Sequence, residues 1–303
     1  MVILLAEPFA EEPRRVLDEL GEVVPWESFV ERLADAEAIV TGLEVHLRKP
    51  ELDRAPRLQV IASRTSQLRH LDVDEATARG IDVLFIEPDA PLLRETSSTA
   101  EETLALILAL VRNVPWAFDA LKQGRWERQR YGGHELKGKK LGIVGFGRLG
   151  RMVAGYGQAL GMRVVANDPR YDASVPLDVL LADSDVVSVH CTFDETTRGL
   201  FGDAQFAAMK PSAYFINTAR GEIADENALL RALERGRLAG AAIDTLEGER
   251  PDGAHLARNP LVDYARTHEN LIVLPHLGGA TVEATERTQL YIARKLADWV
   301  RGR

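Results

Sequence analysis

Residues 140–150 read KLGIVGFGRLG, and this stretch decides how the rest of the chain is interpreted. Gly145, Gly147 and Gly150 form the spacing G-x-G-x-x-G, directly after an apolar run typical of a strand and directly before the helical pattern of 151–160. In such a loop one glycine makes the tight turn, one lets the backbone approach a pyrophosphate, and one permits close packing of helix on strand. The free N–H groups at the start of the helix attract phosphate. The stretch therefore predicts a dinucleotide site.

An acidic residue follows the next predicted strand. Asp168 comes directly after 163–167 and lies 18 residues beyond Gly150 (168 − 150). At that distance a carboxylate can accept hydrogen bonds from the ribose hydroxyls of NAD. A carboxylate also repels the 2′-phosphate of NADP, so we expect NAD(H), although Arg170 tempers this preference. A solvated strand end before Pro169 is the simpler alternative. Because methyltransferases use a similar loop, the motif alone leaves the reaction open.

Short apolar runs alternate with amphipathic helical patterns along nearly the whole chain, which is typical of parallel sheets covered by helices on both faces. We expect two doubly wound α/β domains: a Rossmann-type cofactor domain, 99–281, inserted in a flavodoxin-like substrate domain, 1–98 and 282–303. The apolar helix 99–111 is the expected crossing between them, and the last helix, 283–300, is expected to pack on the first domain. The predicted strands are 2–6, 38–41, 58–62, 81–86, 141–144, 163–167, 186–189, 213–217, 240–243 and 271–274.

Composition narrows the class of protein. The chain has 303 residues, a formal charge of −9, 46% hydrophobic and 27% charged residues, which is ordinary for a globular protein. No apolar run approaches the roughly 20 residues that span a bilayer, and the acidic balance argues against a nucleic-acid partner. Cys191 is the single cysteine, so neither an intrachain disulfide nor a cysteine metal cluster is expected. The start lacks the pattern of a signal peptide. We expect a cytoplasmic protein with no metal site, no membrane partner and no further domain after its last helix.

Three further stretches each follow a predicted strand: FINTARG (215–221), AAIDTLEGE (241–249) and LPHLGG (274–279). Because the carboxyl ends of parallel strands meet at one edge of a sheet, Arg220, Glu249 and His276 should converge there. Arginine can bind a carboxylate through two parallel hydrogen bonds. Histidine can donate a proton as hydride arrives, and glutamate can hold the imidazole. Singly, each residue has a plain structural alternative; together they indicate chemistry on a 2-oxo acid.

This combination closely resembles the D-isomer-specific 2-hydroxyacid dehydrogenases, the family that includes D-3-phosphoglycerate dehydrogenase, from about residue 58 to about 281. The resemblance implies an NAD-dependent oxidoreductase that interconverts a D-2-hydroxy acid and its 2-oxo acid, with NAD in one domain, the anionic substrate held by the other, and a cleft between them. Arg220 then resembles the substrate-binding arginine, Glu249 the partner acid and His276 the acid/base, while Asp244 resembles the acceptor of the nicotinamide carboxamide. A homodimer through the cofactor domain is also implied, and the apolar helix 99–111 is compatible with it. The expected cofactor-binding residues are Gly145, Gly147, Arg148, Leu149, Gly150, Asp168, His190, Thr192, Thr197, Thr218, Ala219, Asp244 and Gly278.

The largest departure from the family pattern lies after the strand 58–62, where relatives commonly carry a glycine-containing loop that binds the substrate carboxylate. Here residues 63–70 read SRTSQLRH, and Ser66, Gln67 and Arg64 are the candidate substrate contacts. Smaller departures are Arg250 before Pro251 and Thr192 in place of a common proline.

The basic residues of this loop indicate which kind of substrate could bind. Arg64, Arg69 and His70 would suit a substrate with a second anionic group, such as a phosphate, a phosphonate or a carboxylate. The alternative is that the arginines are solvated or paired with Asp72, Asp74 or Glu87.

A different class of function remains open on the same scaffold. Relatives of this family serve as corepressors, so the alternative is an NAD(H)-sensing binding protein. The presence of Arg220, Glu249 and His276 together, and the absence of basic segments, favours the enzyme.

Overall fold

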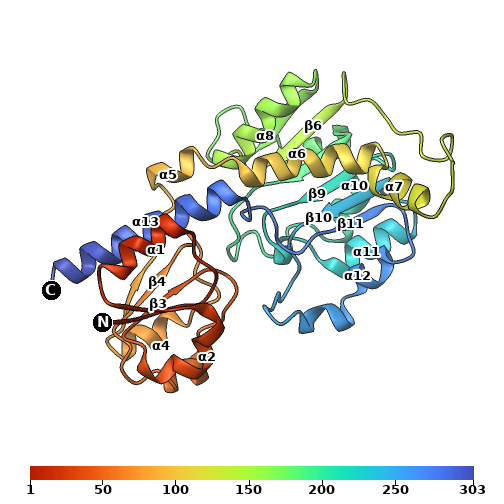
Figure 1. Cartoon of the computed structure of the whole chain (residues 1–303). Helices are drawn as coiled ribbons and strands as arrows, with labels where there is room; N and C mark the ends of the chain where they lie inside the picture. Colours follow the sequence, from red (N-terminus) through yellow and green to blue (C-terminus); the bar gives the residue numbers. More distant parts are fainter. The chain divides into compact units, whose positions relative to one another are not determined.

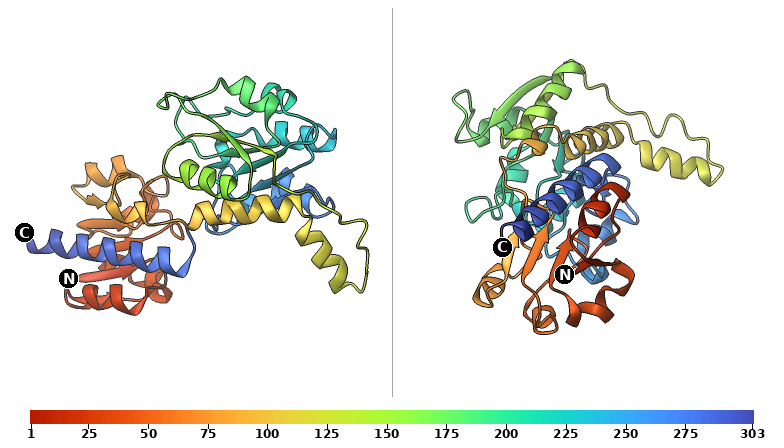
Figure 2. Two further views of the ribbon diagram at one scale, coloured as in Figure 1. Left: turned by 90° about the horizontal axis from the view of Figure 1, so that it is seen from above. Right: turned by 60° about the vertical axis from the view of Figure 1, so that its left-hand side comes forward.

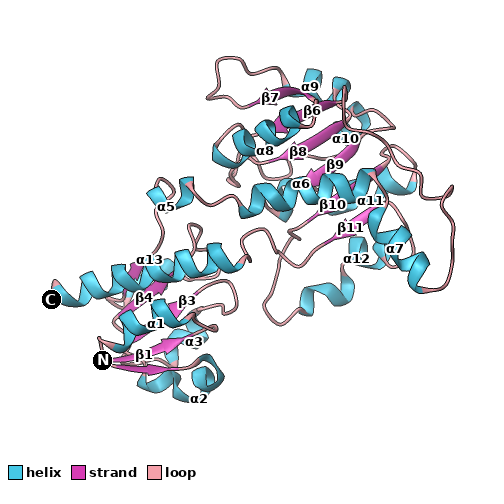
Figure 3. Cartoon of the chain, turned by 45° about the horizontal axis from the view of Figure 1, so that its top comes forward, coloured by secondary structure: helices cyan, strands magenta, loops and turns pink.

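A computed structural model describes all 303 residues, and the chain divides into two compact units. Unit 1 consists of Met1–Thr96 and Thr281–Arg303, and unit 2 of Ser97–Ala280. Both division points lie within two residues of those that the sequence pattern indicates. Each unit contains one wholly parallel sheet with helices packed against it (Figure 3). The expected class, two parallel-sheet α/β domains, is confirmed.

The sheet of unit 1 has the order β2-β1-β3-β4-β5, which is the flavodoxin-like arrangement. The edge strand β2 was not expected from the sequence, because three residues are too few to show a periodicity. The strands are β1 (Val2–Leu5), β2 (Glu22–Val24), β3 (Ala38–Thr41), β4 (Val60–Ser63) and β5 (Asp82–Leu84).

Both faces of this sheet are buried, as the continuous apolar strands predict. Ile3 and Leu5 of β1 pack in a cluster with Leu17 of α1 and Ile292 of α13, whereas Leu4 packs in the cluster of the opposite face. The last helix therefore covers unit 1, as expected (Figure 1). The helices of unit 1 are α1 (Glu11–Asp18), α2 (Phe29–Arg32), α3 (Lys49–Asp53), α4 (Val73–Ala78), α5 (Pro91–Arg94) and α13 (Val282–Arg301), with 3-10 turns η1 (Trp26–Ser28) and η2 (Leu33–Asp35).

The sheet of unit 2 has the order β11-β10-β9-β8-β6-β7. Numbered within the unit this is 2-1-3-4-5-6 read from β7, so it differs from the 3-2-1-4-5-6 order common among dinucleotide-binding domains. A single residue, Val175, hydrogen-bonds to the outer edge of β7 through Ala166. All six predicted strands are present: β6 (Lys140–Val144), β7 (Arg163–Asn167), β8 (Val186–Val189), β9 (Tyr214–Asn217), β10 (Gly240–Ile243) and β11 (Leu271–Val273).

Helices cover both faces of this sheet too. One core lies under α6 and α8, and the other under α9 to α12. Helix α7 and the chain after it extend away from the sheet of unit 2 (Figure 2). The helices are α6 (Ser98–Val111), α7 (Val114–Lys122), α8 (Arg148–Ala159), α9 (Leu177–Asp183), α10 (Asp203–Ala208), α11 (Glu226–Glu234) and α12 (Pro260–Ala265), with 3-10 turns η3 (Gly221–Ile223) and η4 (Ala254–Arg258).

No single helix is long and apolar enough to cross a membrane, and one bent pair, 91–111 with 114–122, passes that test by length and composition only. Much of the apolar surface of α6 in that pair is buried in the core of unit 2.

Candidate active site

The glycine loop lies where two neighbouring strands of unit 2, β6 and β8, end side by side. Gly145 has a φ of +93°, and a side chain there would collide with the backbone of Cys191 just after β8. Only glycine meets both conditions, so this position fixes the turn. In parallel α/β sheets ligands bind at the carboxyl ends of the strands where the connections diverge to the two sides. The connection from β6 runs to β7, on the other side of β6 from β8, so the loop lies at such a point.

Gly147, by contrast, faces open space at the start of α8. A methyl group placed there would meet no atom within 4 Å. Gly147 is the N-cap of α8, and because glycine has no side chain it makes no side-chain cap hydrogen bond at this end of the helix. The N-terminus of a helix beside open space is a favourable place for a pyrophosphate.

Asp168 links the end of β7 to the glycine loop. Its side chain is 5% exposed, and its carboxylate accepts hydrogen bonds from the backbone N–H groups of Phe146 (2.8 Å) and Arg170 (2.9 Å). Burial alone would raise the pKa of Asp168, but these two N–H donors and the charge of Arg170 outweigh it and hold the pKa below its ordinary value. Asp168 is therefore an ionised acceptor next to the loop.

Five further cofactor candidates lie after β8 and β9: His190, Thr192, Thr197, Thr218 and Ala219. Burial lowers the pKa of His190 to about 4, so its imidazole is neutral, and its Nε2 lies 2.8 Å from Ser188 Oγ. Thr197 Oγ1 donates to the carbonyl of Thr192 (2.8 Å). The Thr218 hydroxyl lies 2.8 Å from that of Thr103 in α6, which ties this edge of the sheet to the helix.

The side chains of His276 and Glu249 form a close pair at this edge. His276 Nδ1 lies 2.6 Å from Glu249 Oε2, and because an ionised carboxylate only accepts, Nδ1 is the donor. Glu249 is fixed from behind, since Oε1 accepts from the backbone N–H of Leu246 (2.8 Å). Burial would raise the pKa of Glu249, yet the hydrogen bond and charge of His276, the Leu246 N–H and the charge of Arg220 lower it. The arrangement leaves the second imidazole nitrogen, Nε2, to carry a proton to a ligand.

The backbone holds His276 in this orientation. Its φ of +56° lies in the left-handed region, which side-chain-bearing residues adopt rarely and mostly at functional or tightly held positions. Asp244 supports the turn on both sides: its carbonyl accepts from His276 N–H (2.9 Å), and its carboxylate accepts from Leu277 (2.7 Å) and Gly278 (3.0 Å). Arg220 lies after β9, where Asn217 bridges the turn by donating to the Arg220 carbonyl (2.8 Å).

Residues 104–278 match the family model described as "D-isomer specific 2-hydroxyacid dehydrogenase, NAD binding domain". The chain is 34% identical to D-3-phosphoglycerate dehydrogenase of Methanocaldococcus jannaschii, over 99% of this chain and 57% of that protein. It is 30% identical to glyoxylate reductase of Thermococcus litoralis, over 99% of this chain and 94% of the relative.

The chain belongs to the D-isomer-specific 2-hydroxyacid dehydrogenase family. Among solved structures, D-lactate dehydrogenase from Aquifex aeolicus in complex with NAD and lactic acid aligns with a TM-score of 0.81 at 30% identity, over all of this chain and 96% of that one. The chain spans little more than half the length of the D-3-phosphoglycerate dehydrogenases that it matches.

NAD is the cofactor that this family domain binds, and the residues of unit 2 fit it. The open space at Gly147, the N-terminus of α8 and the ionised Asp168 offer a place for a pyrophosphate and an acceptor for ribose hydroxyls.

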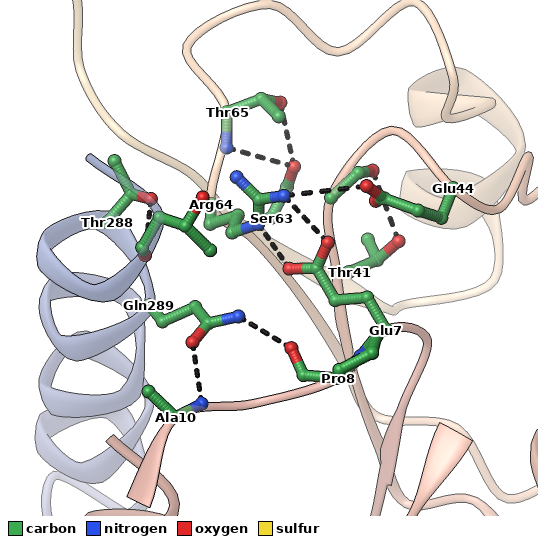
Figure 4. Close-up of polar contacts among 12 residues, drawn as sticks. Glu7, Pro8, Ala10, Thr41, Glu44, Ser63, Arg64, Thr65, Thr288 and Gln289 are labelled. Atoms are coloured by element: carbon green, nitrogen blue, oxygen red, sulfur yellow. Dashed lines mark hydrogen bonds and ion pairs between the residues drawn. The ribbon is translucent and has the colours of Figure 1, made fainter. Parts of the chain in front are cut away.

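In unit 1 the arginine of the expected substrate loop has other partners than the sequence analysis proposed (Figure 4). Arg64 is not paired with Asp72, Asp74 or Glu87; it hydrogen-bonds both carboxylate oxygens of Glu7, with Arg64 Nη2 2.8 Å from Glu7 Oε2, and its Nη2 lies 3.6 Å from Glu44. Its positive charge is therefore matched inside the protein. The backbone N–H groups of Ser66 and Gln67 donate to no other group of the chain, so they remain candidate donors.

His70 also differs from the expected donor. It is 3% exposed, and its Nε2 lies 3.1 Å from Ser63 Oγ. Burial lowers its pKa to about 4, so the imidazole is neutral and brings no positive charge to the loop.

Two acidic residues with unusual surroundings escaped the sequence analysis. Glu7 is 3% exposed, and Glu102, on α6, buries both carboxyl oxygens near Asp244. Glu7 follows directly on an apolar strand, which was a usable signal because ligands gather at such ends. No such signal marks Glu102 in the sequence, since it lies among ordinary polar residues at the start of an apolar helix.

Proposed function

We propose that this protein is an NAD(H)-dependent oxidoreductase that interconverts a D-2-hydroxy acid and the corresponding 2-oxo acid. The observation that carries the proposal is the 2.6 Å contact between His276 Nδ1 and Glu249 Oε2 beside Arg220. A cofactor domain alone would not need this arrangement. The family relatives named as D-3-phosphoglycerate dehydrogenase, glyoxylate reductase and D-lactate dehydrogenase support the same class of reaction.

Each residue has one part in the reaction. NADH, when bound, supplies the hydride. Arg220 binds the substrate carboxylate, because a guanidinium can make two parallel hydrogen bonds to it. His276 gives the proton on Nε2 to the carbonyl oxygen as that oxygen gains charge, and Glu249 stabilises the positive imidazolium before the transfer. In the oxidative direction the neutral imidazole takes the hydroxyl proton.

For the cofactor we propose a preference for NAD(H) over NADP(H), supported by the ionised Asp168 next to the loop. Arg170 Nε lies 3.6 Å from Asp168, so this neighbouring positive charge is partly offset by the carboxylate. Measuring the affinity of both cofactors for the wild type and Asp168→Ala tests the assignment: the variant should lose selectivity by weakening NADH binding and improving NADPH binding.

For the substrate we propose that unit 1 is the substrate domain and that the backbone N–H groups of Ser66 and Gln67 contact the acid. A second anionic group on the substrate has less support than the loop sequence alone suggests, because Glu7 and Glu44 already balance Arg64 and His70 is neutral. Comparing kcat/KM for pyruvate-like monoanions with that for phosphate-bearing oxo acids tests this. A higher value for the monoanions is expected.

The decisive experiment is oxidation of NADH by the purified protein with a panel of 2-oxo acids, followed by absorbance. Turnover with at least one member is expected. Tight NADH binding without turnover on any acid would instead favour the NAD(H)-sensing alternative, and absence of NADH binding would contradict both.

We further propose a homodimer formed through unit 2, and a cytoplasmic location where the reaction draws on the NAD(H) pool. The apolar residues of α6 mostly face the core, so the surface that supports a dimer is instead α7 and the chain after it. Val114, Phe118, Leu121 and Trp126 there are 52%, 60%, 51% and 82% exposed. Large exposed apolar side chains gathered in one stretch of the chain mark an interaction surface. Light scattering should give twice the mass of the chain, and Phe118→Glu should lower it.

A further inference from the structure

An acidic residue of α6 lies against the turn that carries Asp244. A methyl group placed on Gly278 would lie 2.9 Å from Glu102 Oε2 and 3.1 Å from Asp244 Oδ2, so the two carboxyl groups converge on one small space. The next residue of the helix, Thr103, makes the hydroxyl contact with Thr218. Helix α6 thus meets the carboxyl ends of β9 and β10 at the nicotinamide end of the expected cofactor site.

The surroundings of the two carboxyl groups are unequal. Asp244 accepts two backbone N–H groups, those of Leu277 and Gly278. Both oxygens of Glu102 are buried, and no donor of the chain reaches them. A buried carboxylate without donors beside a second carboxylate is strongly disfavoured, so one proton belongs to this pair. Burial raises the pKa of Asp244, but its two backbone N–H donors oppose that rise, whereas Glu102 has no such donors, so the proton belongs on Glu102.

We propose that Glu102 is a positioning residue for the nicotinamide end of the cofactor site, a neutral carboxylic acid that donates a hydrogen bond to Asp244 and thereby fixes the carboxylate that the carboxamide meets. This inference rests on the proposed function, which assigns that contact to Asp244. Burial first, and then the charge of Asp244, raises the pKa of Glu102 to about 8. The acid is therefore neutral at pH 7 and ionises in mild alkali.

The charge of the nicotinamide ring should affect whether Glu102 keeps its proton. The nicotinamide ring of NAD+ is positive and that of NADH is neutral, so ionised Glu102 favours NAD+ relative to NADH. The other ionisable groups facing this place are His276, whose charge acts on Asp244, and Glu249, which is bound to His276. They are unchanged in a Glu102 variant, so a comparison at position 102 isolates its proton.

The test measures the dissociation constants of NADH and NAD+ at pH 6.5 and 9.5, by fluorescence and calorimetry, without turnover. For the wild type the ratio Kd(NADH)/Kd(NAD+) should rise about tenfold between the two pH values, the change expected for a one-unit difference in the Glu102 pKa between the two complexes. Glu102→Gln keeps a neutral donor and should bind NADH at pH 6.5 like the wild type, with a ratio that no longer changes with Glu102 ionisation. The matched control Glu101→Gln, exposed on the same helix, should behave like the wild type.

Two more measurements keep the inference open to refutation. Glu102→Leu, neutral but without a donor, should weaken NADH binding at pH 6.5 by roughly tenfold. In the absence of cofactor, the Tm of Glu102→Gln relative to the wild type should rise between pH 5 and 9. Only the wild type is destabilised over this range, because only it must ionise a buried acid in the folded state. An unchanged pH dependence of the ratio in Glu102→Gln, with normal turnover, would overturn this inference alone. A wild type that bound neither cofactor would overturn the proposed function and this inference together.

Discussion

The two sheets share a strand order, but the charged side chains at their carboxyl edges have different partners. Both sheets are parallel and share the order 2-1-3-4-5 in their first five strands, with a sixth added in unit 2. In unit 1 the charged residues after the strands, Glu7, Glu44 and Arg64, bind one another (Figure 4). In unit 2 the charged residues after β9 to β11 are held largely by backbone groups, and the side-chain pair His276–Glu249 keeps one imidazole nitrogen unused.

The difference shows what a topology does and does not determine. A parallel sheet collects loop residues at one edge in both units. Whether their charges cancel there depends on which partners the loops supply. Backbone N–H groups stabilise the carboxylates of Asp244 and Glu249 without adding a side chain that would occupy the space in front of them. Unit 2 can therefore act on a ligand through side chains whose positions are already fixed.

The largest effect should come from His276→Ala. Removing proton transfer costs about 10²–10⁴-fold in turnover, while NADH affinity should stay near that of the wild type, because the glycine loop and Asp168 are untouched. Steady-state kinetics and NADH titration measure the two quantities. The control is His268→Ala, an exposed histidine of the same unit stacked on Tyr264, which should leave turnover unchanged. Equal losses in both variants would show that His276 has no special role.

The next largest effect is expected from filling the open space at Gly147 in the glycine loop. Gly147→Ala should leave Tm nearly unchanged, because no atom lies within 4 Å of the added methyl group. It should nevertheless weaken NADH binding by at least about tenfold, equivalent to about 1.4 kcal/mol, by occupying the approach of the pyrophosphate. Gly155→Ala, at an equally open position later in α8, is the matched control and should bind NADH normally. If Gly147→Ala also bound NADH normally, the loop assignment would be wrong.

Features of the fold and the site that depend on neighbouring residues could be predicted from the sequence, whereas contacts between residues far apart in the chain could not. The glycine loop and the six strands of unit 2 are local patterns, and the structure contains them all. The pairing of Arg64 with Glu7 joins residues 57 positions apart through the shapes of two loops, which no spacing encodes. The same holds for Glu102 and Asp244. The edge strand β2 was missed because three residues are too few to show a periodic pattern, and the strand is stabilised by its pairing with β1.

A smaller, pH-dependent effect tests the side-chain pair of unit 2. In Glu249→Gln the carboxylate that would stabilise a protonated imidazole is replaced by a neutral amide, so the pH at which 2-oxo acid reduction declines should move lower. Rate profiles of kcat/KM against pH for both proteins measure the shift. A profile that kept its midpoint would remove Glu249 from the role of partner to His276 and leave it as a support for the Leu246 turn.

The smallest effect concerns stability and tests the matched charges of unit 1. Burial raises the pKa of Glu7 to about 7 even though Arg64 pulls it down, whereas an unfolded glutamate titrates near 4.5. A raised pKa in the folded state means that the protonated form is favoured there, so this contribution to stability is complete below about pH 4.5 and is lost as pH rises through about 7. Glu7→Gln cannot titrate, so its Tm relative to the wild type should rise between pH 5 and 8, whatever its absolute value. Glu12→Gln, at an exposed position of α1, should give a curve parallel to the wild type. If the Glu7→Gln curve were also parallel to the wild type, Glu7 would be ionised throughout this range, and the charge cluster of unit 1 would carry a net negative charge at neutral pH rather than a balanced one.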